Sequence, residues 1–295
     1  ELMDYFRRVY KREIGSDNEI RTFDGFPCST ASPMQIEFRI DQTPNAMRSY
    51  AEITLYGLSA ASRQAIAQRF QKVRLTAGYV GSYGQIFIGE IENVSMGRAG
   101  AESFVRLYCQ AGADKFGAVY VSRGFGANTP ALEIILAVAR TFGYPIEVVG
   151  DFSQLPRAIR GEVLFGASQI EMDKLARRYG FRWFIENGQV TIIKHDATRP
   201  GAAFQFTAQN GLIGSPELAV DGVSIDVLLN PVIRPADQFT VEAVTGRASF
   251  HSIYYQRFTG LGRGLYRVTS LQHEGSFYGD RWQTKLHGAR PEGLQ

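Results

Sequence analysis

Hydrophobic and polar residues alternate in several stretches between residues 34 and 112. Ala51, Ile53 and Leu55 are separated by polar or aromatic residues, and the same period of two recurs over 105–109. Such alternation is typical of strands that bury one face in an antiparallel sheet. The pattern therefore predicts a small β-barrel or sandwich in this part of the chain.

Two local signals interrupt these strands. Gly81-Ser82-Tyr83-Gly84 predicts a glycine-containing hairpin loop between two of them. The stretch from Ser59 to Phe70 predicts one short helix, with Ser59 or Ser62 as its N-cap. The first region is thus expected to be mainly β with a single helix.

The period changes to that of helices in the middle of the chain. Thr129-Pro130 predicts an N-cap followed by proline at the first helical position. A second helix is predicted from Ser168, with Glu171 completing a capping box. Two strands on either side of Asn187-Gly188 predict a hairpin. Residues 129–196 are therefore expected to form a compact α+β module.

Strand character returns after Arg199-Pro200-Gly201. Alternation over 223–227 predicts one strand, and 265–273 and 281–287 predict a terminal hairpin. We expect these last strands to pair only within their own region, so that residues 200–290 close a second barrel.

The predicted fold class is mainly β with an α+β insertion, in which two antiparallel β-barrels flank a small helical and hairpin domain. The predicted domains are 1–125, the first barrel with an N-terminal segment; 126–198, the inserted α+β domain; and 199–295, the second barrel.

Composition narrows the classes of function. The chain has 295 residues, a net charge of +3 and 44% hydrophobic residues, values typical of globular proteins that are stable without disulfides or metals. Cys28 and Cys109 stand alone, and the four histidines are scattered. They form neither a disulfide framework nor a zinc motif. We therefore expect no metal, no cofactor and no enzyme that depends on either a thiol or a metal.

Arginine outnumbers lysine by 26 to 6. Arginine forms bidentate pairs with carboxylates at interfaces, so the excess fits a surface that packs against protein partners; a high coding G+C content gives the same bias. The chain has no basic tract typical of nucleic-acid binders. No apolar stretch reaches the roughly 20 residues that span a bilayer, and no apolar segment follows the charged N-terminus, so we expect neither a membrane span nor a secretory signal.

Candidate catalytic groups lack the context that their chemistry needs. A strand rather than a helix follows Gly260-Leu261-Gly262-Arg263-Gly264, which favours a loop over a phosphate site. Glu90 and Glu92 are predicted about 7 Å apart on one strand face, near the spacing of glycosidase carboxylates, but any exposed strand gives this geometry. Two further pairs have no nucleophile motif around them: His195 with Asp196, and Ser249 with His251. Phe181 and Trp183 could form a ligand platform, but packing into the module core is favoured.

Longer segments resemble a known family. They are Asn210-Gly211-Leu212-Ile213-Gly214-Ser215-Pro216-Glu217 with Gly222-Val223 and Leu228-Leu229-Asn230-Pro231-Val232-Ile233-Arg234-Pro235, then Tyr266-Arg267-Val268, Leu271-Gln272-His273-Glu274-Gly275, Asp280-Arg281-Trp282-Gln283-Thr284 and Leu286-His287-Gly288, and in the first barrel 51–58 and 86–91. In order and spacing they resemble phage tail baseplate hub proteins of the late-control protein D and type VI spike-related group.

This resemblance implies that both barrels are tail-tube-like and that three copies form a pseudo-sixfold ring. The ring would join the tail tube to a central spike or fibre complex. Implied partners are a tail tube or distal tail protein, the tape-measure protein and a central spike or fibre protein, with genomic DNA passing through the channel without sequence-specific binding. The resemblance further implies a non-enzymatic protein without a membrane anchor, made in the host cytoplasm and located in the virion tail baseplate.

Two sets of residues are predicted to serve this role. Arg234, Arg247, Arg257 and Arg263 lie around turns of the second barrel and are predicted interface contacts. Glu90 or Glu92 is predicted to face the channel, where a negative wall would keep DNA from adhering. Two alternatives stay open: a receptor- or carbohydrate-binding tail module, for which Tyr254, Tyr255 and Phe258 are candidates, and a cell-wall hydrolase component.

Overall fold

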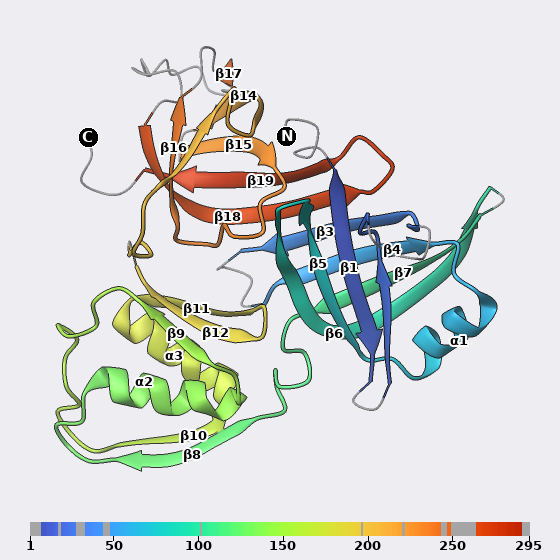
Figure 1. Ribbon diagram of the computed structural model, residues 1–295. Helices are drawn as coiled ribbons and strands as arrows, with labels where there is room; N and C mark the ends of the chain where they lie inside the picture. The colour runs from blue at the N-terminus through green and yellow to red at the C-terminus, as the bar shows by residue number, and fades with distance from the viewer. Residues whose placement is uncertain are drawn as a thin grey trace.

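The computed structural model describes residues 7–16, 19–27, 33–43, 48–100, 102–195, 197–219, 222–242, 247–248 and 264–290. The protein is mainly β, and an α+β unit lies beside a large twisted sheet (Figure 1). The predicted fold class, mainly β with an α+β insertion, is confirmed.

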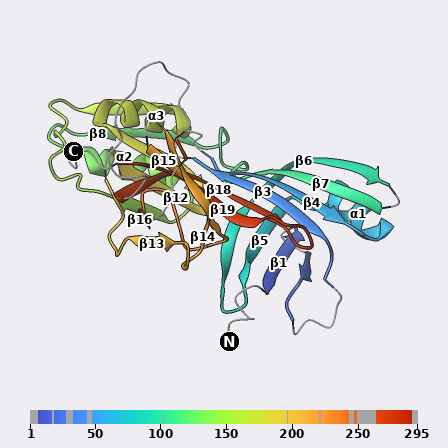
Figure 2. The same ribbon diagram turned by 90° about the horizontal axis from the view of Figure 1, so that it is seen from above.

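The N-terminal part is an antiparallel sheet with one helix. Its elements are β1 (Arg8–Gly15), β2 (Ile20–Asp24), β3 (Ile36–Gln42), β4 (Tyr50–Tyr56), α1 (Ala60–Gln68), β5 (Lys72–Tyr79), β6 (Ser82–Ala99) and β7 (Glu102–Gln110). The Ser59 hydroxyl accepts a hydrogen bond from the Ser62 amide at 3.1 Å, which confirms Ser59 as the cap of α1. The predicted hairpin is present, but its turn is Val80-Gly81, and Ser82, Tyr83 and Gly84 of the predicted loop belong to β6 and pair with β5. Strands β6 and β7 extend together past the other strands, with α1 beside them (Figure 2).

The inserted module has three layers (Figure 1). Its elements are β8 (Tyr120–Phe125), α2 (Ala131–Ala139), the short 3-10 helix η3 (Arg140–Phe142), β9 (Ile146–Val149), β10 (Glu162–Ala167), α3 (Ser168–Tyr179), β11 (Phe181–Glu186) and β12 (Gln189–Lys194). Helices α2 and α3 lie between the sheet β11-β12-β9 and the ribbon β10-β8. Asn187 and Gly188 have φ values of 49° and 74°, so the predicted tight turn is confirmed.

The helix caps of the module differ from the prediction. Pro130 is the cap of α2 and not its first residue, and the Thr129 hydroxyl donates to the Gly126 carbonyl. Ser168 is already inside α3, because strand β10 leads directly into the helix at Ala167. Its buried hydroxyl has no hydrogen-bond partner among the described residues, and Glu171 pairs with Lys174. The predicted capping box is therefore wrong.

The C-terminal part supplies the remaining strands. They are β13 (Phe204–Thr207), β14 (Leu212–Ala219), β15 (Gly222–Leu228), β16 (Gln238–Glu242), β17 (Arg247–Ala248), β18 (Gly264–Ser276) and β19 (Trp282–Ala289). Strand β18 pairs with β19, as expected, and also with β3 of the N-terminal part. The expectation that the last strands pair only within their own region is wrong. Strand β18 is long enough to offer its first residues to β16 and its last residues to β3.

One sheet therefore runs through both parts of the chain. Its neighbours follow the order β17-β14-β15-β19-β18-β3-β4-β7-β6-β5-β1-β2. The predicted domain boundaries stay a prediction. Strand β8 pairs with β10 across the limit drawn at residue 125, and β18 pairs with β3 across the limit drawn at residue 198.

The tip of the last hairpin packs into the N-terminal core. Trp282 is buried there, with its ring edge-on to Phe38 at 5.2 Å between centroids. Its indole N–H donates to the Gly78 carbonyl at 2.9 Å, and the Tyr79 hydroxyl donates to the Trp282 carbonyl at 2.9 Å. The Arg8 guanidinium donates to the Ser276 carbonyl at 2.8 Å. These contacts hold the last hairpin, β18-β19, against strands β1 and β5 of the N-terminal part.

A buried histidine lies where the two parts meet. His273 on β18 stands opposite Ile40 of β3, and its Nδ1 is 2.9 Å from the Thr284 hydroxyl. Burial lowers the pKa of His273 from 6.5 to about 3, because the charged imidazolium would lose its hydration there. The native protein therefore holds this side chain neutral.

We expect acid to destabilise the protein through His273. Below pH 6.5 the unfolded chain takes up a proton that the native state does not bind, so stability falls until the pH reaches the native pKa. Between pH 7.5 and 5.0 the uptake of this proton by the unfolded chain should lower the free energy of unfolding by about 2 kcal/mol. Urea unfolding at both values measures the loss, which should be smaller by that amount in His273→Asn. His195→Asn, at an exposed site, is the control; equal losses in both variants would contradict the prediction.

Candidate assembly surfaces

The sheet that joins both parts has one apolar and one polar face. Residues opposite each other on neighbouring strands share a face. Ile40, Ile53, Leu107, Leu271 and Leu286 lie on the face that is buried in the core. The other face carries polar side chains from β6 to β15. One row across seven strands consists of Glu90, Gln110, Tyr50, Asp41, Gln272, Lys285 and Asp226.

Acidic side chains predominate on this polar face. On this face and on the neighbouring β14 the basic residues are Arg39, Arg106, Arg267 and Lys285, and the acidic ones are Glu37, Asp41, Glu52, Glu90, Glu102, Glu217, Asp226 and Glu274. Ion pairs join some of them, with Arg106 Nε 3.1 Å from Glu52 Oε1 and Lys285 Nζ 3.5 Å from Glu274 Oε2. Partial burial raises the pKa of Asp226; Lys285 lowers it, and Glu274 raises it. Negative charge is therefore concentrated on this face.

The polar face is also hollowed. One depression of about 480 Å³ has Asp41, Ser224 and Asp226 in its lining. A second depression of about 510 Å³ is bordered by Arg39 and Glu52. Both are open to solvent and lined mainly by polar groups, so the surface fits a polar, hydrated neighbour better than an apolar ligand.

The two predicted channel residues have different surroundings. Glu90 belongs to the polar face, and its Oε2 accepts a hydrogen bond from the Ala113 amide at 2.7 Å. Partial burial raises its pKa, and the nearby Asp114 adds to the effect. Glu92 lies at an irregularity in the pairing of β6 with β7, where the strict alternation fails. Its carboxylate is 3.7 Å from Arg48, and it is largely exposed. Their position at a channel wall stays a prediction.

The predicted interface arginines are only partly described. Arg234 is half-exposed, and its Nη1 lies 3.3 Å from Glu147 Oε2 on β9 of the inserted module. Arg247 lies in the two-residue strand β17.

Several predicted residues lie outside the described part of the chain: Cys28, Asp196, Ser249, His251, Tyr254, Tyr255, Arg257, Phe258 and Arg263.

A buried ion network joins the module to the C-terminal part. Arg199 is its centre, and its guanidinium pairs with Glu147 and, at 3.3 Å, with Glu186. Its Nε donates to the Pro235 carbonyl at 2.9 Å. Burial raises the pKa of Glu186 to about 7, against the opposing effect of Arg199. In the sequence, Arg199-Pro200-Gly201 marks only the point after which strand character returns, because the acidic partners of Arg199 come from distant segments.

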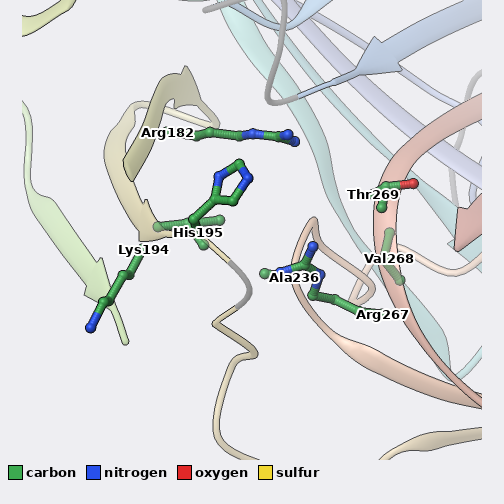
Figure 3. A pocket seen from close by; sticks show the side chains of 8 residues that line it. Arg182, Lys194, His195, Ala236, Arg267, Val268 and Thr269 are labelled. Atoms are coloured by element: carbon green, nitrogen blue, oxygen red, sulfur yellow. The ribbon is translucent and has the colours of Figure 1, made fainter. Parts of the chain in front are cut away.

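A small pocket at the same junction has no catalytic arrangement. It is lined by Arg182, His195, Ala236, Arg267 and Thr269 together with Ile193, Lys194 and Val268, and its volume is about 30 Å³. Figure 3 shows Arg182 and His195 on one side, Arg267 and Thr269 across from them, and Lys194 pointing away. The space suffices for little more than a water molecule.

Phe181 and Trp183 belong to the core of the module. Both are buried, and the Trp183 indole N–H donates to Asp173 Oδ1 at 2.8 Å. The predicted packing role is thus confirmed.

In the described part of the chain, no three His, Cys, Asp or Glu residues gather as a metal site would need. No helix among these residues is long and apolar enough to cross a membrane.

Comparison with known proteins identified one matching family. The model of the family described as Baseplate hub gp41 matches residues 21–246, which is more than half of the chain. No curated protein matches the sequence.

Solved structures share the fold at low sequence identity. A 43 kDa tail protein of prophage MuSo2 from Shewanella oneidensis has a TM-score of 0.60 and 11% identity, over 97% of this chain and 99% of its own. A tail protein from Neisseria meningitidis MC58 has a TM-score of 0.59 and 9% identity, over 97% of both chains. An E. coli protein, described as a type VI secretion component similar to the T4 tail proteins gp27 and gp5, has a TM-score of 0.53 and 10% identity, over 88% of this chain and 74% of its own.

Proposed function

Because this chain belongs to the baseplate hub gp41 family, we propose that it is a structural, non-enzymatic hub and that three copies form a ring with pseudo-sixfold symmetry. The ring joins the tail tube to a central spike or fibre complex and forms part of the DNA channel. Its other neighbours are the distal tail protein and the tape-measure protein, and its location is the baseplate of the virion tail.

The observation that carries this proposal is the polar face of the continuous sheet. Seven paired strands from both parts of the chain present polar side chains on one hollowed surface, and acidic groups predominate among its charges. A negative wall repels phosphates, so DNA moves past it without adhering. We therefore assign this face to the channel, with Glu90 on it and Glu92 at its margin.

The edges of the sheet support closure by further copies. Strand β6 continues past Glu90, where its pairing with β5 ends, so the rest of β6 has no strand on the side away from β7 among the described residues. At the β17 end of the strand order, β17 pairs with β14 only at Glu217 and Leu218. Two different edges can meet in a head-to-tail contact, which is the kind of interface that closes a ring. Such contacts also cover edges that would otherwise promote aggregation.

The proposed arginine contacts can be tested by charge reversal. In the ring, Arg234, Arg247, Arg257 and Arg263 contact neighbouring proteins, and Arg234→Glu also loses its ion pair with Glu147. We expect Arg247→Glu and Arg263→Glu to reduce trimer formation or tube attachment, as measured by native mass spectrometry and by sedimentation with tail tubes. Arg39→Glu, on the proposed channel face, is the control. Unchanged trimer formation and attachment in all interface variants would reject the assignment.

Charge reversal on the proposed channel face should make DNA adhere. The double variant Asp226→Lys and Glu52→Lys places two cations on this surface, and we expect about tenfold tighter binding of duplex DNA at low salt, falling steeply as salt is added. Electrophoretic mobility shifts measure the binding, and ejection from phage carrying the variant should slow. Glu133→Lys, on the exposed side of α2, is the control. DNA binding and ejection like those of the parent protein would contradict the channel assignment.

A further inference from the structure

The ribbon of the inserted module presents an unusual surface. Strands β8 and β10 pair only with each other among the described residues. One side of the ribbon buries Val121, Phe125 and Leu164 toward the helices. The other side exposes Tyr120, Val163 and Phe165, which are 70%, 77% and 79% accessible. We call this outward side the ribbon face.

The register keeps the ribbon face poor in polar groups. Phe165 stands opposite Ser122, and Val163 stands opposite Gly124. Ile159, in the loop before β10, is also almost fully exposed. Single exposed apolar residues are ordinary, but several on one two-stranded ribbon with unpaired edges are typical of a contact surface. A two-stranded ribbon is also marginal by itself, so a covering partner would stabilise it.

The charges around the ribbon face indicate the chemistry of that partner. Arg123 stands opposite Leu164 and lies on the helix side of the ribbon, 5.4 Å from the centre of the Phe125 ring, so it does not belong to the ribbon face. In the loop before β10, Arg157 donates to the Asn128 carbonyl at 3.2 Å. Arg160 is exposed in the same loop as Ile159. Within the described ranges no carboxylate pairs with Arg157 or Arg160, whereas Glu162 pairs with Arg178. The surface therefore has uncompensated positive charge beside exposed apolar side chains.

The position of the ribbon separates it from the proposed channel. It is the outer layer of the module, with α2 and α3 between it and the sheet β11-β12-β9 (Figure 1). The polar face belongs to the large sheet, which lies beyond the sheet β11-β12-β9, on the side of the module away from the ribbon (Figure 1). A partner on the ribbon face is thus distinct from anything inside the channel.

From these observations we infer that the ribbon face docks a segment of another protein that carries both acidic and apolar side chains. Apolar side chains of that segment cover Val163 and Phe165, and its carboxylates pair with Arg157 and Arg160. The inference goes beyond the hub function and does not depend on the number of copies in the ring.

Site-specific photo-cross-linking tests this inference in the intact assembly. Phe165 is replaced by p-benzoylphenylalanine in the full chain, tails are assembled and irradiated, and the product is sequenced by mass spectrometry. We expect a cross-link to a different protein, within a segment that contains both acidic and apolar residues. A cross-link to a second copy of this chain, to nucleic acid or to lipid would overturn the inference, as would no product from tails that contain the chain at its normal copy number.

A second substitution in the photoactive chain tests the role of charge. Arg160→Glu should reduce the cross-linked fraction about tenfold, because it replaces an attraction by a repulsion. Arg177→Glu is the matched control, since it makes the same charge reversal at an exposed position of α3. An Arg160→Glu yield equal to that of the control would overturn the acidic character of the partner. Circular dichroism of each variant verifies that the module is folded.

Discussion

Replacing Trp282 with alanine should lower the free energy of unfolding by about 3–5 kcal/mol. The indole fills the N-terminal core although it belongs to the last hairpin of the chain. Its removal leaves a cavity beside Phe38 and leaves the Gly78 carbonyl without its donor. Urea unfolding followed by circular dichroism measures the loss.

Tyr278→Ala is the matched control for this prediction. Tyr278 is an aromatic residue in the same hairpin, but it is 65% exposed. Its replacement should cost at most about 1 kcal/mol. If Trp282→Ala were no more harmful than this control, the last hairpin would not fasten the two parts of the chain.

Replacing Arg199 with leucine should lower the free energy of unfolding by about 3–5 kcal/mol, because it leaves buried carboxylates without their counter-charge. Glu186 is nearly inaccessible and loses its nearest cation, while Glu147 keeps only Arg234 among its partners in the described part of the chain. Arg177→Leu, at an exposed position of α3, is the control and should stay within about 0.5 kcal/mol of the parent protein.

The cost of Arg199→Leu should depend on pH. The native pKa of Glu186 is raised to about 7 from 4.5, so the native state favours the protonated form, and that contribution to stability is lost as the pH rises through the native pKa. Without Arg199 the native pKa rises further. The variant should therefore lose more stability at pH 8.5 than at pH 5.5, and adding Glu186→Gln should remove most of the difference. A loss independent of pH would contradict this account of the network.

Local patterns in the sequence predicted local structure well. The strand alternation around Ile53 and Leu107, the Ser59 cap and the Asn187-Gly188 turn all appear in the fold. Each depends on side chains within a few residues of one another, so the sequence carries the signal directly. The order of the longer motifs also indicated the family that the matching family model identifies.

Features that depend on distant segments were not predicted. The pairing of β18 with β3 joins residues more than 200 positions apart, and nothing in either strand specifies that partner. Strand β1 was missed because Arg12 occupies an inward position and interrupts the apolar pattern. Its guanidinium is fully buried, 4.4 Å from the centre of the Phe23 ring, and burial lowers its pKa to about 10.

The candidate surface was predicted only in part. Glu90 was singled out on a strand that does contribute to the polar face, but six other strands complete its row. Glu92 was expected beside it because residues at i and i+2 share a face on a regular strand. The irregularity between Ile91 and Asn93 cannot be read from the alternation of residue types.

Electron cryomicroscopy of the assembled tail tip shows both how many copies form the ring and which way the polar face of the sheet is turned. We expect three copies of this chain in one ring, with Asp41, Glu52 and Asp226 of each copy facing the axis and the ribbon face directed away from it. A different number of copies, or a ring with the polar face of the sheet turned outward or covered by another protein, would contradict this expectation.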